Sequence, residues 1–367
     1  MAIKIFHTGD IHIGMKFNRY IDNVRESLIE ARFETLENMI NKSNELNSDI
    51  FVVAGDLFNS IKIPQRDIKR VVSILNKFNG ECVLVLPGNH DYDDGLNELW
   101  IEFQKNDSDK ILLLNEKKPY ILKDYGLDIE VYPAPCDSKH SESNSLTWIK
   151  EEGILNTCKY KIGIAHGALE GLSADMQGQY FYMTFDELNQ IPVDIWMIGH
   201  THVRYPLNDT LKNNKIYNAG THEPDGLDYR DEGSAWFIEL DDEINARRII
   251  TGKYRFMDKL FEVDSEESLE EIKNFVEKNN PEKLILRLNL NGRLSKEIYD
   301  DIRSFYYEIE NKVFDLVVDA NNLKEKIDKS IIDEEFTKGS FPYELLNRLS
   351  EDEEALQIAY ELINKER

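Results

Sequence analysis

Short apolar runs alternate with amphipathic stretches over the first two thirds of the chain. The runs at residues 3–6, 50–54 and 83–86 are rich in apolar and β-branched residues and are followed closely by Gly, Asp or Asn, a pattern typical of buried strands. Longer stretches between them carry apolar residues at helical spacing. Residues 1–254 are therefore predicted to form one α/β domain in which helices flank β-sheet.

The pattern changes near residue 255. The order becomes strand, capped helix, strand, helix and strand, at residues 259–263, 265–278, 283–290, 295–309 and 313–318. This order predicts a separate, small α+β domain over residues 255–325. Residues 326–367 are predicted to be a helical segment with a turn near Leu349. Ser350 and Glu353 fit a Ser-x-x-Glu capping box ahead of its last amphipathic helix.

The composition is that of a folded, soluble protein. No run of about eighteen apolar residues occurs, so a membrane span is not expected. Met1 leads directly into a strand-like run rather than a signal peptide, and a cytoplasmic protein is expected. Cys82, Cys136 and Cys158 form no CxxC pair, which argues against a disulfide framework or a thiolate zinc site.

The charge limits how the protein could bind a polyanion. A formal net charge of -25 argues against a protein that grips nucleic acid over its whole surface, because such binding relies on lysine and arginine. Two bound divalent ions would add about four positive charges inside a cleft, and the local field matters more than the net charge. Acidity therefore weakens a DNA-binding hypothesis without excluding it.

Side chains able to bind metal follow five of the predicted strands. Five of the eight histidines stand in these turns, whereas chance would scatter them over surface and loops. Ligands collect beyond the carboxyl ends of strands in α/β sheets, so residues from five such ends are expected to converge. The candidates are Asp10, His12, Asp56, Asn89, His90, His166, His200 and His202.

These residues lie in motifs that resemble those of calcineurin-like metallophosphoesterases. The motifs are Asp10-x-His12, Gly55-Asp56, Gly88-Asn89-His90-Asp91, His166 and Gly199-His200-x-His202. The fuller strings at residues 7–14 and 55–58 are similar to the SbcD type of DNA repair exonuclease, the counterpart of the nuclease subunit of a double-strand-break repair complex. The resemblance implies a four-layer β-sandwich flanked by helices, followed by a small α+β capping domain.

The resemblance also implies roles for the candidate ligands. Asp10, His12 and His202 would bind one metal ion, and Asn89, His166 and His200 a second. Asp56 would bridge both, which reduces the repulsion between two cations roughly 3.5 to 4 Å apart. Oxygen and imidazole ligands suit manganese, iron or zinc, and the resemblance favours two Mn²⁺ ions.

His90 has a separate implied role as the catalytic acid. In the family such a histidine protonates the leaving oxygen while a metal-bridging hydroxide attacks phosphorus in line. Asp91 follows His90 directly and is expected to orient its imidazole as part of the catalytic group. An additional, purely structural ligand is the alternative role for His90.

Other residues near the motifs have weaker signals. Asn59 stands where many relatives have a second acid, and His7 is expected to be a buried supporting or core residue. His222 is expected at the rim of the site or in a structural role, and His140 in a surface loop. Lys16, Arg19, Arg25 and Arg32 could contact the DNA backbone, or they could pair with helix acids Glu26, Glu30 and Glu34.

The resemblance implies a manganese-dependent DNA exonuclease and endonuclease that acts in DNA-end processing or double-strand-break repair. Its expected partners are DNA, an SbcC-like coiled-coil ATPase of the structural-maintenance type, and a second copy in a homodimer. Residues 341–362 are expected to dock the ATPase, with coverage of the chain's own core as the alternative. Two other functions remain open: hydrolysis of a small phosphodiester or nucleotide, and a non-catalytic metal-binding scaffold.

Overall fold

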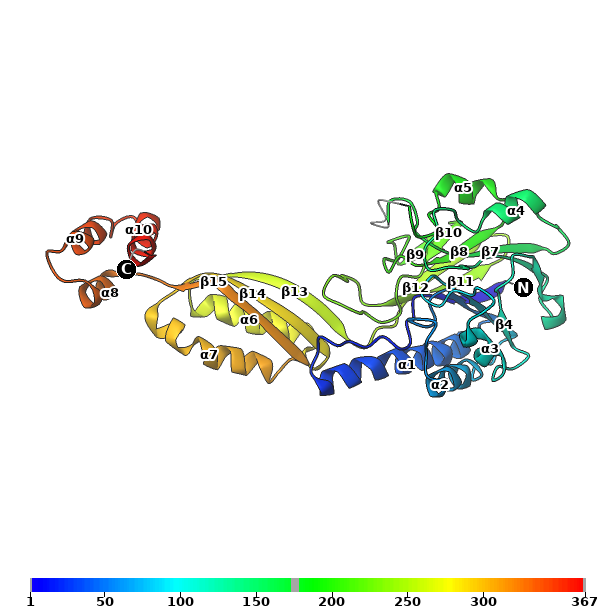
Figure 1. The fold of residues 1–367 in the computed structure, drawn as a ribbon, viewed down its shortest axis with the longest axis horizontal. Coiled ribbons are helices and arrows are strands. Elements are labelled where there is room, and N and C mark those ends of the chain that lie inside the picture. Colours follow the sequence, from blue (N-terminus) through cyan, green and yellow to red (C-terminus); the bar gives the residue numbers. More distant parts are fainter. Residues whose placement is uncertain (1, 173–177, 366–367) are drawn as a thin grey trace. The chain divides into compact units, whose positions relative to one another are not determined.

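The computed structural model describes residues 2–172 and 178–365, which form two compact units (Figure 1). The first unit is Met1–Arg255 and the second is Phe256–Arg367. None of the helices in the described ranges is long and apolar enough to cross a membrane.

Two sheets form the centre of the first unit. In the described residues the larger sheet has the order β4-β3-β2-β1-β11-β12-β9, and the smaller has the order β10-β8-β7-β6-β5. The larger sheet comprises β1 (Ile3–Thr8), β2 (Ile50–Ala54), β3 (Cys82–Leu86), β4 (Ile111–Leu113), β9 (Thr210–Lys212), β11 (Ser234–Leu240) and β12 (Ile244–Ile250). The smaller comprises β5 (Tyr120–Ile121), β6 (Ile129–Ala134), β7 (Tyr160–His166), β8 (Ile195–Gly199) and β10 (Ile216–Asn218).

Strand direction decides where the polar turns lie. β1, β2, β3 and β4 run parallel to one another, as do β6, β7, β8 and β10. The added strands β11, β12 and β9 are antiparallel. Within each parallel set the carboxyl ends share one edge, so the turns after β1, β2 and β3 are neighbours, and so are those after β7 and β8.

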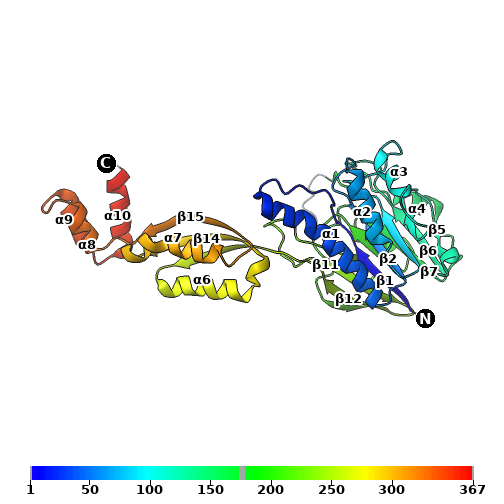
Figure 2. The same ribbon diagram turned by 90° about the horizontal axis from the view of Figure 1, so that it is seen from below.

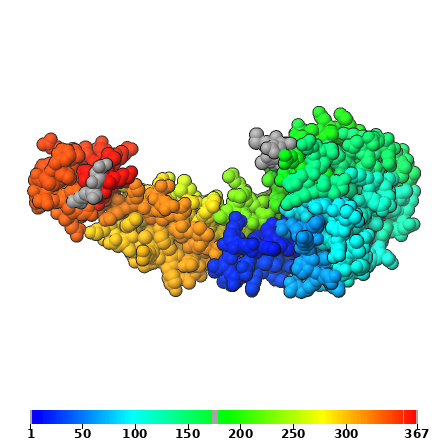
Figure 3. All heavy atoms as spheres, viewed as in Figure 1, coloured from blue at the N-terminus to red at the C-terminus, as the bar shows by residue number. Residues whose placement is uncertain are grey.

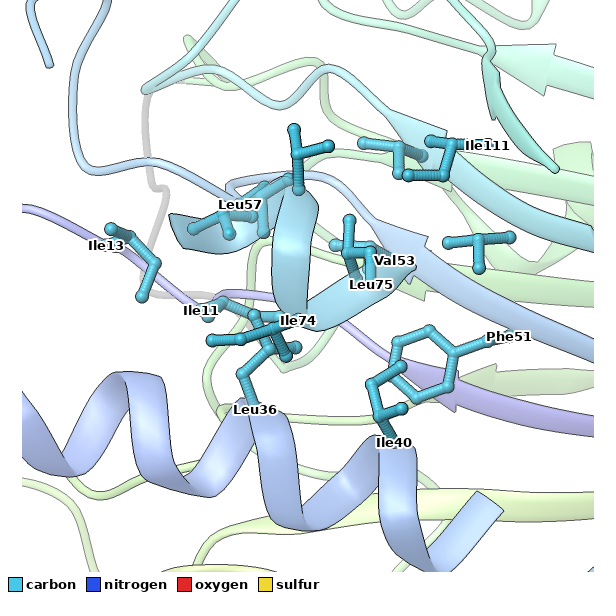
Figure 4. Packing of buried hydrophobic residues seen from close by; sticks show 14 of the residues in the cluster. Ile11, Ile13, Leu36, Ile40, Phe51, Val53, Leu57, Ile74, Leu75 and Ile111 are labelled. Atoms are coloured by element: carbon cyan, nitrogen blue, oxygen red, sulfur yellow. The ribbon is translucent and has the colours of Figure 1, made fainter. Parts of the chain in front are cut away.

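Helices cover the outer face of the larger sheet (Figure 2). They are α1 (Asp22–Glu45), α2 (Gln65–Leu75) and α3 (Glu98–Gln104). Phe51 and Val53 of β2 pack against Leu36 and Ile40 of α1 and Leu75 of α2 (Figure 4). The alternate residues of β2 belong to the core between the two sheets, because successive side chains of a strand point to opposite faces.

The smaller sheet has its own helical layer, α4 (Thr147–Glu152) and α5 (Phe185–Gln190). Trp148 of α4 stacks on Tyr132 of β6 with 6.2 Å between ring centroids. Trp196 of β8 donates from Nε1 to the Leu188 carbonyl of α5 over 2.9 Å. The unit therefore has four layers, helix, sheet, sheet and helix, and the predicted fold class is confirmed.

The second unit begins with a three-stranded sheet in the order β13-β14-β15, formed by β13 (Arg255–Val263), β14 (Leu284–Leu294) and β15 (Asp315–Glu325). Helices α6 (Glu266–Lys278) and α7 (Lys296–Glu310) lie on one face of it (Figure 2). Ile272 and Val276 of α6 share a core with Leu286 and Leu288 of β14. Ser265 caps α6 by accepting from the Ser268 amide, which confirms the predicted cap.

Three helices follow, α8 (Lys329–Glu335), α9 (Phe341–Arg348) and α10 (Glu353–Lys365), and they gather into one group in the space-filling view (Figure 3). They have an apolar cluster of their own that includes Ile332, Phe336 and Leu346. The predicted Ser350 cap is wrong. Asp352 Oδ1 accepts from the Ala355 amide instead, because the Ser350 hydroxyl donates to the Asn347 carbonyl of the preceding turn.

Candidate metal centre

The turns that follow the parallel strands have an unusual backbone. Asp10, His12, Asp56 and His200 have φ values of 52°, 49°, 52° and 104°, a region that costs a residue other than glycine about 1 to 3 kcal/mol. The surrounding structure imposes these conformations. The Asp10 amide donates to the Gly55 carbonyl over 3.1 Å, and the His12 amide donates to the Asp56 carbonyl over 2.9 Å. The turns after β1 and β2 therefore form one rigid support.

Glycine allows the turns to approach closely at two positions. A Cβ atom on Gly55 would lie 2.0 Å from His166 Nδ1, and one on Gly88 would lie 2.2 Å from Asp56 Oδ1. No side chain fits at either distance without displacing a candidate ligand. The glycines beside the motifs therefore serve packing as well as turn geometry.

One group of candidate ligands consists of Asp10, His12 and His202, which the structure brings together as potential metal donors. His12 Nε2 and His202 Nε2 are 3.1 Å apart, and His202 Nε2 is 3.9 Å from Asp10 Oδ1. Both carboxylate oxygens of Asp10 accept from the His200 amide over 3.0 Å. These contacts fix Asp10 while its oxygens and both imidazoles converge.

A second group contains Asp56, His166 and His200, with Asn89 between the two imidazoles. Asn89 Oδ1 lies 3.1 Å from His166 Nε2 and 2.9 Å from His200 Nδ1. Asp56 Oδ2 lies 3.4 Å from His166 Nε2 and 3.6 Å from His12 Nε2. Asp56 thus contacts both groups, the position expected of a bridging carboxylate, and all seven candidate ligands meet at one place.

Burial and neighbouring charges shift the pKa values of the donor groups. Burial opposes ionisation of Asp56, but His166 and His12 outweigh it and hold the pKa of this carboxyl below its usual range. Burial also opposes protonation of His166, but Asp56 raises its pKa to about 9. Burial and neighbouring imidazoles lower the pKa of His200 to about 3. Carboxylate, amide and imidazole donors together fit two divalent ions such as manganese, iron or zinc.

Thiolate does not contribute to this donor set. Burial raises the pKa of the Cys136 thiol well above its ordinary value, and its Sγ donates to the His166 carbonyl over 3.5 Å. In the described residues, each group of potential metal donors consists of Asp and His alone.

Asp225 supports His202 from behind, and it was not predicted from the sequence. Its Oδ2 lies 2.9 Å from His202 Nδ1, which leaves His202 Nε2 directed to Asp10 and His12. Arg32 Nη2 lies 3.8 Å from the same oxygen, and Arg32 is buried while it donates to the Ile11 carbonyl over 2.9 Å. A carboxylate behind a ligand histidine fixes its tautomer and orientation.

His90 reaches the site from the turn after β3. Its ring meets the His12 ring edge-on with 4.9 Å between centroids, and its Nδ1 lies 3.2 Å from the Asn59 carbonyl oxygen. Its amide donates to Asp56 Oδ1 over 2.8 Å. Asn59 thus contacts the site through its main chain.

The predicted role of Asp91 in orienting His90 is wrong. The Asp91 carboxylate accepts from the Gly88 amide over 2.7 Å and from the Phe58 amide over 2.9 Å, because the turn folds its side chain back under the main chain. Burial, and then Asp56, raises the pKa of Asp91 to about 8. Asp91 links the turns after β2 and β3. The group that contacts the His90 ring is the Asn59 carbonyl, not the Asp91 carboxylate.

The remaining histidines lie as follows. His7 is buried in β1, and burial lowers its pKa to about 3. His222 is also buried and pairs with the Arg32 carbonyl over 3.2 Å, so of its two expected roles the structural one is correct. His140 is exposed, but its ring lies 5.0 Å from that of Tyr180.

Only some of the basic residues that were expected to contact DNA are exposed and without a carboxylate partner in the ion pairs given below. Lys16 and Arg19 are exposed, and Arg19 lies over the Tyr20 ring at 5.2 Å. Arg25 pairs with Asp22 over 3.0 Å. The proposed pairing with Glu30 and Glu34 is wrong, because those acids pair with Arg70 and Lys253 instead.

Comparison with known proteins decides the family. The sequence profile of calcineurin-like phosphoesterases matches residues 3–204, which include every candidate ligand and His90. The chain belongs to the calcineurin-like phosphoesterase family.

Three proteins that the chain is similar to share little sequence identity with it. The uncharacterized metallophosphoesterase YhaO of Bacillus subtilis is 24% identical over 216 residues, which cover 56% of this chain and 50% of YhaO. The chain thus spans about half the length of this curated relative. The crystal structures of TT1561 of Thermus thermophilus and of a dimetal phosphatase from Danio rerio each have a TM-score of 0.40 and 11% identity. They cover 65% and 68% of this chain, and 95% and 98% of their own chains.

Family membership and the donor groups agree. The chain has the family's metal-binding motifs, and in the described residues three groups of potential donors overlap. They are Asp10, His12 and His202; His12, Asp56 and His90; and Asp56, His166 and His200, and together they support two divalent metal ions.

Proposed function

We propose that the chain is a DNA nuclease, both exonuclease and endonuclease, that processes DNA ends. The supporting observation is that the two SbcD-like strings at residues 7–14 and 55–58 build the paired turns of the site. The β-bridge between Ile13 and Phe58 joins the ends of these two strings. The separate α+β unit after the phosphoesterase domain agrees with this assignment.

The proposal gives each side chain a task. The seven ligand candidates would hold two divalent ions, preferably manganese, which supply Lewis acidity and lower the pKa of water. Because His90 Nδ1 faces the Asn59 carbonyl, its Nε2 is the atom that would donate a proton to the departing sugar oxygen. Asp56 accepts from the His90 amide, so metal binding and the acid are held by the same carboxylate.

A small phosphodiester is the second candidate substrate, and the net charge of -25 favours it. Cleavage of labelled linear DNA in manganese, measured beside bis-p-nitrophenyl phosphate, separates the two. The nuclease proposal expects both substrates to be hydrolysed, and Asp56→Ala to abolish both activities. Turnover of the small ester without DNA cleavage in any divalent metal would refute the nuclease. No turnover of either substrate would favour a non-catalytic scaffold.

A partner ATPase of the coiled-coil, structural-maintenance type belongs to the same proposal. The α8–α10 group exposes Phe341, Ile358 and Leu362, which are 77%, 51% and 58% accessible. Exposed apolar side chains gathered on a small helical group favour a docking role over coverage of the chain's own core. A pull-down with a coiled-coil ATPase of this type should lose binding in Phe341→Asp. Tyr307→Asp, another exposed aromatic residue of the second unit, is the control that should keep it.

A homodimer is the remaining part of the proposal. Leu96 and Ile101 are 85% and 49% exposed in the first unit and border a groove with Ile63 and Leu99. Light scattering should give twice the chain mass, and Leu96→Asp should give the monomer mass. A monomer for the wild-type protein would refute this part.

A further inference from the structure

Arg32 is a buried cation on the inner face of α1. Its side chain is 1% exposed, and it stands four residues from each of the core residues Leu28 and Leu36. Burial lowers the pKa of Arg32, and the Asp225 carboxylate opposes this shift. Because a buried charge is costly unless it is paired, this arginine needs partners inside the domain, and it is too deeply buried to contact DNA.

The Arg32 guanidinium contacts both chain segments that carry the first donor group. That group comprises Asp10, His12 and His202. Arg32 Nη1 donates to the carbonyl of Ile11 over 2.9 Å, and Ile11 is the residue between the two ligands of the turn after β1. Arg32 Nη2 lies 3.8 Å from Asp225 Oδ2, the oxygen that lies 2.9 Å from His202 Nδ1. One planar side chain therefore joins the turn after β1 to the residue behind His202.

The turn after β1 has a backbone that needs such support. Asp10 and His12 have φ values of 52° and 49°, a region in which a residue other than glycine is strained. The hydrogen bond from Arg32 fixes the Ile11 carbonyl, which belongs to the peptide that joins Ile11 to His12. The Phe17 ring faces the guanidinium, with 5.7 Å between Cζ and the ring centroid. The guanidinium is thus held on its face as well as at its edge.

Helix α1 is itself fastened to the segment that contains Asp225. His222 Nε2 pairs with the Arg32 carbonyl over 3.2 Å, and Thr35 Oγ1 donates to Glu223 Oε2 over 2.7 Å. His222 and Glu223 stand within three residues of Asp225 in the sequence. The main chain and the side chain of Arg32 therefore hold the same segment, and the guanidinium is placed before any metal binds.

We infer that Arg32 is a positioning residue for the metal ion bound by the first donor group. Its two guanidinium nitrogens fix the turn after β1 relative to His202, and a lysine, with one nitrogen, lacks the fork that reaches both segments. The second donor group has a support of its own, since His166 Nδ1 pairs with the Ala54 carbonyl over 2.9 Å. The inference rests on the assignment of two metal ions, and it holds for a DNA or a small-ester substrate alike.

The test is calorimetric titration of metal-free protein with Mn²⁺, resolved into two binding steps. Arg32→Met keeps an unbranched stem but removes the charge and the donors. It should weaken one ion by about 10-fold to 100-fold, the usual loss when a residue behind a metal ligand is removed, and leave the other within about 2-fold. Arg32→Lys should weaken the same ion by less, because it keeps the charge without the fork. Lys42→Met is the control, since Lys42 of the same helix pairs with the exposed Glu45 over 2.9 Å.

Removal of one ligand shows which ion Arg32 serves. In a His202→Ala background, where the first group is already disrupted, Arg32→Met should add no further loss. In a His200→Ala background, where the second group is disrupted, Arg32→Met should still weaken the remaining ion. Thermal unfolding of the metal-free variants shows that each is folded. If Arg32→Met does not fold, Arg32→Lys makes the same comparison in both backgrounds.

Three results would count against this role. Equal weakening of both ions would mean that Arg32 only stabilises the fold, and would overturn the inference. Wild-type affinities in Arg32→Lys would also overturn it, because the fork would then not be needed. Wild-type protein that does not bind two Mn²⁺ would refute the metal assignment itself, which separates the two failures.

Discussion

Replacement of Asp225 tests whether a residue outside the family motifs controls the metal centre. Asp225 Oδ2 lies 2.9 Å from His202 Nδ1, while Nε2 of the same ring faces Asp10 and His12. Burial opposes the charge on Asp225, but the bond with His202 and the charge of Arg32 hold its pKa well below the usual range. The pair therefore amounts to a hydrogen bond with a charged partner, worth about 1.5 to 3 kcal/mol.

Asp225→Leu should lower manganese affinity by about 10-fold to 100-fold, the usual loss when a residue behind a ligand is removed. Asp225→Asn should lose less, because its amide oxygen still accepts from His202 Nδ1. Asp242→Leu is the control, since Asp242 is 97% exposed in its side chain. The assay is calorimetric titration of metal-free protein, with thermal unfolding to confirm that each variant is folded.

Wild-type affinity in Asp225→Leu would refute the reasoning. Equal losses in the Leu and Asn variants would refute it as well, because the hydrogen bond would then not be the cause.

Three further predictions concern catalysis, stability and metal. His90→Ala should lower kcat on DNA by about 100-fold to 10,000-fold but cost far less with bis-p-nitrophenyl phosphate, whose leaving group needs no proton; equal losses on both would contradict an acid role. Burial opposes ionisation of Glu130, but bonds from Tyr132 and Thr157 lower its pKa from 4.5 to about 2. Because the folded pKa lies below the unfolded value, about 3 kcal/mol of stability present at neutral pH should be lost as pH falls from about 5 to 2. Chemical denaturation across that range should show a flatter curve for Glu130→Gln, and an unchanged curve would contradict it. Chelation should abolish hydrolysis and added manganese should restore it; activity that survives exhaustive chelation would contradict a metal-dependent enzyme.

The strand ends could be predicted because their signal is local. Each apolar run of the parallel strands is short, and the polar ligand follows within a few residues, as in residues 50–56. Parallel pairing then places these turns on a shared edge, and all seven candidate ligands lie together. The layered fold follows from the same alternation of buried strands and amphipathic helices.

Contacts between distant segments could not be predicted in this way. Asp225 reaches His202 and Arg32 only after three separate segments are folded together, and no motif surrounds it. One local signal did exist, since Arg32 stands four residues from both Leu28 and Leu36 on the buried face of α1. A cation on an apolar face indicates a buried partner, but it does not identify that partner.

The direction of a side chain within a tight turn could not be predicted from the sequence either. Asp91 follows His90 in sequence, yet its carboxylate points to the amides of Gly88 and Phe58. The chain direction at the turn, rather than sequence adjacency, decides which group faces the His90 ring. The cap of α10 was missed for a similar reason, because Ser350 still belongs to the turn after α9.

The central claim is a centre for two metal ions bridged by Asp56, and counting bound manganese tests it most directly. Metal-free wild-type protein, titrated and then analysed for metal content, should bind two Mn²⁺ per chain and gain hydrolytic activity as the second site fills. His90→Ala should still bind two, since His90 is assigned to proton donation. Asp56→Ala should lose tight binding at both sites together with hydrolysis. A single Mn²⁺ per chain at full activity, or undiminished hydrolysis in Asp56→Ala, would contradict the account.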